Sequence, residues 1–132
     1  MDRSFTRSLF LLLVALVAAN QAIYAAEESA HQYKLVIDYG DGSERHFTAL
    51  PWKEGLTVLE ATKIAEKHPR GISTKIRGSG STAFLTQIDD VANEGNGRNW
   101  VFRVNGKLGD RSSGIYKIDD GDTILWRFQK YE

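Results

Sequence analysis

Three aspartates form the densest group of residues that could bind a cation. Asp119, Asp120 and Asp122 stand directly before a run of alternating apolar residues, and divalent cations such as Ca²⁺ prefer carboxylate oxygens. Asp-Gly-Asp before a strand is also ordinary turn chemistry. No histidine or glutamate neighbours the three aspartates to complete a ligand set. We therefore interpret the group as a turn and expect no metal site.

The sequence lacks the residue combinations of familiar hydrolases. Its histidines, His31, His46 and His68, fall in a tail, an expected strand and the end of an expected helix. There is no cysteine, no Gly-x-Ser-x-Gly nucleophile elbow and no His-Glu-x-x-His zinc motif. We predict that the chain is not an enzyme.

Two loops have only part of a ligand-binding motif. Asp38, Asp41 and Ser43 suggest a calcium loop, but the regular spacing and the closing glutamate of such loops are missing. Residues 77–81 read Arg-Gly-Ser-Gly-Ser, yet no Lys-Ser or Lys-Thr pair follows them and they lead to an expected strand, unlike a phosphate-binding loop. We interpret the first as a hairpin turn and the second as a flexible loop.

Two connections contain candidate ligand-binding groups. Trp52 follows a proline in a connection, where a large aromatic residue either covers the core or stacks on a ligand. The connection 107–117 contains Arg111 and Ser112, whose N–H and O–H groups could meet the polar edge of a ligand. A solvated crossover without a partner is the alternative for this connection.

Two arginines lie one residue out of phase with an alternating apolar pattern. The apolar set consists of Trp100, Phe102, Val104, Ile124, Trp126 and Phe128. Its period of two predicts two half-buried strands with this set in the core. Arg103 and Arg127 then fall on the solvent face of the sheet beside Val101 and Leu125. A planar or acidic partner could dock on such a face.

The rest of the pattern predicts the elements that position these groups. Residues 33–39 and 44–50 alternate on either side of a Gly-Asp-Gly-Ser turn, which is typical of a β-hairpin. Thr57 and Glu60 form a capping box at the start of a helix that ends at His68-Pro69. Further strands are expected at 72–76 and 83–88. We predict an α+β fold of the β-grasp (ubiquitin-like) kind, with one helix packed on a mixed sheet.

The first residues have the layout of a secretory signal peptide. Arg3 and Arg7 precede an apolar run from Leu9 to Ala19, and small residues follow up to Ala26. At ~1.5 Å per residue this run is too short for a ~30 Å hydrocarbon core. We predict a signal peptide at 1–26, a short tail at 27–32 and one domain at 33–132. The product is expected to be periplasmic or extracellular, with no stable membrane anchor after signal removal.

Charge and cysteine content limit the class of partner. The whole chain has 17 basic and 17 acidic residues, and the 106 residues after Ala26 have 15 and 16. A near-neutral domain argues against a nucleic-acid partner, which requires clustered Lys and Arg. Without cysteine the core must be held by packing alone.

Four motifs give the sequence a more specific likeness. They are Thr57-Val58-Leu59-Glu60-Ala61, Phe84-Leu85-Thr86-x-Ile88-x-x-Val91, Trp100-x-Phe102-x-Val104-Asn105-Gly106 and Gly114-Ile115-Tyr116-x-Ile118-x-Asp120-Gly121-Asp122-x-Ile124. With these motifs, residues 35–128 resemble the transcobalamin-like C-terminal domains, a family of small exported domains. In the vertebrate cobalamin carriers the related domain closes over one face of a corrinoid that a second, helical domain mainly binds.

We therefore predict a non-enzymatic exported binding module. The resemblance implies a corrinoid or another large planar cofactor as its small-molecule ligand, and the candidate binding residues are Trp52, Arg103, Arg111, Ser112 and Arg127. The alternative is a protein-interaction or scaffold domain that pairs with a protein partner through an exposed sheet edge, without a small-molecule ligand.

Overall fold

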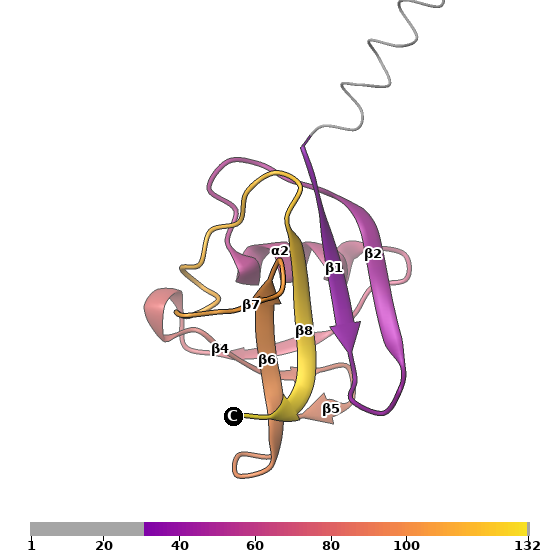
Figure 1. The fold of residues 1–132 in the computed structure, drawn as a ribbon, viewed down its shortest axis with the longest axis vertical. Helices are drawn as coiled ribbons and strands as arrows, with labels where there is room; N and C mark the ends of the chain where they lie inside the picture. Colours follow the sequence, from indigo (N-terminus) through magenta and orange to yellow (C-terminus); the bar gives the residue numbers. More distant parts are fainter. Residues whose placement is uncertain (1–30, 132) are drawn as a thin grey trace, which may run out of the picture. The chain divides into compact units, whose positions relative to one another are not determined.

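The computed structural model describes residues 31–131, so the predicted signal peptide and most of the predicted tail lie outside the described residues. The strands are β1 (Gln32–Asp38), β2 (Glu44–Pro51), β3 (Thr74–Arg77), β4 (Phe84–Ile88), β5 (Val91–Ala92), β6 (Arg98–Val104), β7 (Lys107–Leu108) and β8 (Thr123–Lys130). Helix α2 (Val58–Ile64) continues into the 3-10 helix η1 (Ala65–Lys67), and a second 3-10 helix, η2 (Gly80–Thr82), precedes β4. The fold is therefore mixed α+β, with one α-helix in the described part of the chain (Figure 1).

A five-stranded mixed sheet in the order β2-β1-β8-β6-β7 forms the centre of the fold. The predicted hairpin is confirmed as the antiparallel pair β1 and β2. Strand β8 lies parallel to β1, with Leu35 opposite Ile124, and antiparallel to β6, with Phe102 opposite Trp126. The first and last strands of the described chain, β1 and β8, thus lie side by side within the sheet (Figure 1).

The apolar set predicted from the alternation in residues 99–128 is buried as expected. Trp100, Phe102 and Val104 of β6, together with their counterparts on β8, lie in one core with Leu35 and Ile37 of β1. The side-chain period of a strand explains this, because every second residue points to the same face of the sheet.

Strands β3, β4 and β5 form a second sheet, which shares no strand pairing with the first. Polar side chains connect the two sheets. The Tyr39 hydroxyl donates to Asp89, which also accepts from the Ser73 N–H. Asn93 bridges β4 and β6, because its Nδ2 donates to the Leu85 carbonyl and its Oδ1 accepts from the Trp100 N–H. These bonds fix the small sheet next to the outer edge of β6.

Helix α2 begins where the capping pattern predicts. The Thr57 hydroxyl accepts from the Glu60 N–H at 3.2 Å. The reciprocal bond of the predicted capping box is not among the hydrogen bonds of residues 31–131; Thr57 instead pairs through its backbone with Lys117. Carbonyl groups of Tyr116 and Ser113 accept from the first helical N–H groups, so the connection before β8 completes the cap.

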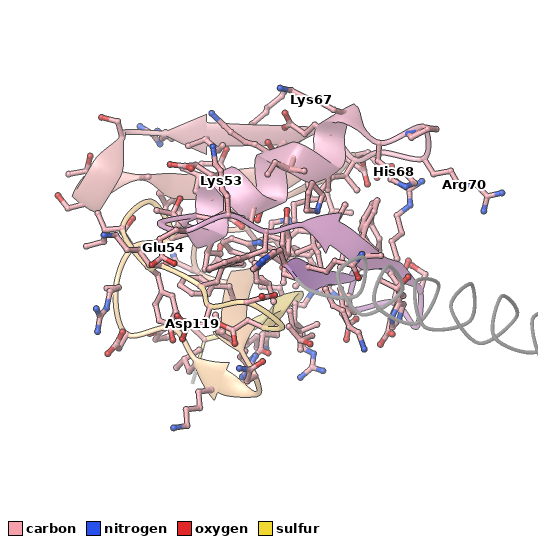
Figure 2. The ribbon with its side chains drawn as sticks, turned by 90° about the horizontal axis from the view of Figure 1, so that it is seen from above. Lys53, Glu54, Lys67, His68, Arg70 and Asp119 are labelled. Atoms are coloured by element: carbon pink, nitrogen blue, oxygen red, sulfur yellow. The ribbon has the colours of Figure 1, made fainter. Side chains whose placement is uncertain are left out.

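One face of the helix packs on the five-stranded sheet. Thr62 is fully buried there and accepts from the Trp126 indole N–H of β8, while the Tyr33 hydroxyl of β1 donates to the Ala61 carbonyl at 2.6 Å. The helical segment ends at His68, before a proline, as predicted. Figure 2 shows Lys67, His68 and Arg70 at this end of the helix and Lys53 and Glu54 near its start.

No helix within residues 31–131 has the length and apolar character needed to cross a membrane.

Candidate functional site

A cleft of about 240 Å³ lies along the outer edge of β6. Its walls come from 83–85 at the start of β4, 99–102 of β6, 108, 109 and 111–113 after β6, and Trp126 and Tyr131. Most of the surface that lines it is apolar. Mostly apolar clefts with a few polar groups are the usual form of small-ligand sites.

Large apolar side chains are concentrated around this cleft. Among the described residues, the large hydrophobic side chains that are strongly exposed are Phe84 (55 %), Leu108 (46 %), Tyr131 (70 %) and Ile115 (44 %). The first three line the cleft, and Ile115 does not. An exposed apolar cluster costs solubility and usually marks a binding surface, so the cleft is the best candidate site.

The floor of the cleft contains backbone groups that the sheet leaves open. On the side of β6 that faces away from β8, the Trp100 N–H bonds Asn93 at 2.8 Å and the Phe102 carbonyl accepts from the Gly109 N–H at 3.0 Å. Strand β7 pairs only with the last two residues of β6. Within residues 31–131 no group bonds the Trp100 carbonyl or the Phe102 N–H on this side.

The connection 109–114 forms one wall of the cleft and is held by close packing. Gly109 lies under the Phe102 ring, where a Cβ would come within 2.2 Å of ring carbon. The Ser112 hydroxyl contacts the Gly80 and Ala83 carbonyls at 3.1 and 2.8 Å. The predicted flexible loop at 77–81 is therefore partly ordered as η2, because Ser112 and its own Ser79 and Thr82 caps fix it.

Arg111 supplies the positive charge at the cleft. Its guanidinium forms two hydrogen bonds with Asp110, at 2.8 and 3.1 Å, and lies over the Tyr116 ring. The bonds to Arg111 lower the pKa of the Asp110 carboxyl, and the same pairing raises the pKa of Arg111. The net charge that this pair offers a ligand is therefore close to zero.

The structure brings only some of the predicted binding residues together. Arg111 and Ser112 line the cleft, although Ser112 already bonds the wall. Trp52 is half-buried against the core, donates from Nε1 to the Ile118 carbonyl at 2.9 Å and stacks on His31. The lid interpretation of Trp52 fits this position, which is away from the cleft.

Arg103 and Arg127 lie on the face of the sheet opposite the core, as the alternation predicts. Arg127 Nε contacts Asp38 Oδ2 at 3.0 Å, and Arg103 donates to Gln129. Val101, predicted to be a solvent-facing neighbour, is only 7 % exposed. Val101 therefore lies on the predicted face, directly opposite Arg127 and beside the cleft, but it is buried there and not exposed to solvent.

Two of the three aspartates before β8 use their carboxylates to hold the neighbouring turns. Asp120 accepts from the N–H groups of His31 and Gln32, and Asp122 accepts from Asn105 Nδ2 and the Asp119 N–H. Within residues 31–131 no group of three or more His, Cys, Asp or Glu side chains is placed to hold a metal ion. The aspartates thus join the start of β1 to the β6–β7 and β8 turns.

The sequence did not single out Phe84, Leu108 and Tyr131. The alternation of a strand predicts which residues lie in the core. It does not mark Phe84 or Leu108 as different from their neighbours in the sequence. Their exposure follows from the gap between β4 and the edge of β6, which no local pattern reports. The lining includes no Asp, Glu, His, Lys or Cys side chain.

A family model described as Domain of unknown function (DUF4430) matches residues 55–130. Among solved structures, a candidate metal-binding protein from Ruminococcus gnavus ATCC 29149 is similar, with a TM-score of 0.54 and 15 % identity over 76 % of this chain and 98 % of that one. Haptocorrin in complex with Cbi is also similar, with a TM-score of 0.61 and 17 % identity over 80 % of this chain. The matched part is 26 % of haptocorrin. No curated protein matches the sequence.

Proposed function

The chain belongs to the DUF4430 family, and from this membership and the cleft we propose that it is a non-enzymatic exported binding module with a β-grasp fold. The hairpin, the one α-helix of residues 31–131 and the parallel β1–β8 pair support the β-grasp assignment. The apolar cleft carries the functional proposal. The signal-peptide pattern of residues 1–26 supports export.

The ligand class that we propose is a corrinoid or another large planar cofactor. The transcobalamin-like resemblance of the motifs supports this choice, and so does the fold shared with part of haptocorrin. A cleft of about 240 Å³ accepts only one edge of such a molecule. We therefore expect weaker binding than in a protein that encloses the whole cofactor.

Tryptophan fluorescence tests this proposal, because Trp100 and Trp126 line the cleft. Titration with cyanocobalamin should quench the protein beyond the inner-filter effect. Phe84→Ser should weaken this binding, whereas Ile115→Ser, which changes a similarly exposed side chain outside the cleft, should not. Absence of specific quenching at high micromolar cyanocobalamin would reject the cofactor proposal.

The second candidate is a protein-interaction role through an exposed sheet edge. The open Trp100 carbonyl and Phe102 N–H favour it, because edge strands with unpaired backbone groups can accept another strand. This second candidate uses the same cleft as the cofactor proposal, but its partner is a protein strand and not a planar cofactor.

A further inference from the structure

The backbone groups left open on β6 favour one direction for a strand that pairs with it. In an antiparallel pair, one residue of β6 exchanges both its N–H and its C=O with one partner residue. Trp100 cannot do so because its N–H is bonded to Asn93, and Phe102 cannot because its C=O is bonded to Gly109. An antiparallel partner could therefore reach the two open groups only through two different residues, each of which would leave its other backbone group facing β6 without a bond.

A parallel partner needs a different pair of groups. One residue of the added strand donates its N–H to a carbonyl of the edge strand and accepts from the N–H two residues further on. The Trp100 carbonyl and the Phe102 N–H have this spacing, with Val101 between them. They are also the groups that no residue in the described chain bonds at the cleft.

We propose that the cleft binds a short extended peptide segment that adds to β6 in the parallel direction, with one peptide residue opposite Val101. This inference rests on the proposed function only in taking the cleft as the binding site. The segment is short because Asn93 occupies the edge at one end and Gly109 at the other.

The lining defines the composition of the peptide. Side chains next to the central peptide residue lie on the core side of β6, because side chains alternate along a strand. The small sheet packs against Trp100 on this side and contributes Phe84, which is exposed and apolar, to the cleft wall. The central side chain lies on the face that carries Val101 and the arginines, and Leu108 is on the same face because it is the β7 partner of Arg103. The favoured segment thus has two apolar residues flanking a residue such as threonine, whose methyl group can contact Leu108, and it needs no charge because Arg111 is already paired with Asp110.

The probe is the peptide Ac-Lys-Leu-Thr-Leu-Lys-NH2, titrated into the ¹⁵N-labelled chain. We expect a downfield shift of the Phe102 amide proton and weak binding, of about millimolar Kd or tighter. N-methylation of the threonine removes the N–H that bonds Trp100 and should weaken binding at least about tenfold. N-methylation of the second leucine, whose N–H points away from β6, should change Kd by less than about twofold.

Protein variants provide a second control. Phe84→Ser should weaken the peptide at least about fivefold, and Ile115→Ser should leave its Kd unchanged. No shift at Phe102, shifts confined to β2, or equal effects of both methylations would overturn the inference. Shifts that depend on protein concentration without peptide would assign the edge to self-association and would also overturn it. If cyanocobalamin moves the cleft resonances but the peptide does not, the inference fails and the proposed function stands; if the peptide binds and cyanocobalamin does not, the reverse holds.

Discussion

The hydrogen bond between Trp126 and Thr62 joins the helix to the central strand and should be costly to break. Trp126 Nε1 donates to Thr62 Oγ1 at 2.9 Å, and the same hydroxyl donates to the Val58 carbonyl at 2.7 Å. Thr62 is 0 % and Trp126 is 3 % exposed, so water cannot replace a lost partner. Thr62→Val keeps the side-chain shape but leaves the indole N–H unpaired, which we expect to lower the free energy of unfolding by about 1–3 kcal/mol.

A double-mutant cycle separates this bond from changes in packing. Trp126→Phe removes the N–H, so adding Thr62→Val to it leaves no unpaired donor. The double variant should therefore be more stable than the sum of the single effects by about 1–2 kcal/mol. Urea unfolding followed by far-ultraviolet circular dichroism measures all four proteins without relying on tryptophan emission.

Thr48→Val is the matched control, because Thr48 is exposed on β2. Its effect should stay within about 0.5 kcal/mol. If Thr62→Val is equally mild, or if the two core substitutions are additive, the helix does not lie on β8 as described.

Three further predictions concern the cap, the core and alkaline pH. Thr57→Ala removes the side-chain acceptor of the Glu60 N–H and should cost about 1 kcal/mol; an unchanged urea midpoint would argue against this helix start. Trp100→Ala should cost about 3–5 kcal/mol by opening a cavity, and Arg103→Ser on the opposite face no more than about 0.5 kcal/mol, in the same assay. Burial raises the pKa of the Tyr33 phenol. The unfolded chain therefore loses this proton first, and stability should fall as the pH rises above about 10; Tyr33→Phe should make that fall shallower, and an identical pH profile would contradict the assignment.

Period-two alternation was sufficient to predict the buried face of the central strands. Trp100, Phe102 and Trp126 lie in the core because a half-buried strand sends every second side chain to one side. Thr57 could be recognised as a helix cap for a similar reason, since the cap depends on residues three apart in the sequence. Both features are set by local chemistry.

The cleft could be predicted only in part. Arg111 and Ser112 were candidates because they lie in a loop on a rigid sheet, and the loop does form a wall of the cleft. Phe84, Leu108 and Tyr131 are far apart in the sequence and line one cleft only in the folded chain. The open groups of Trp100 and Phe102 belong to the backbone, which every residue shares, so no side-chain pattern reports them.

Amide hydrogen exchange of β6 tests most directly whether this edge is open for binding. In the free chain, the Val101 and Arg103 N–H groups bond β8, whereas the Phe102 N–H faces the cleft unpaired. We predict that Phe102 exchanges at least about tenfold faster than either neighbour, and that a bound ligand slows it. Protection of Phe102 equal to that of Val101 and Arg103 in the free chain would contradict the account, because the edge would then already be closed.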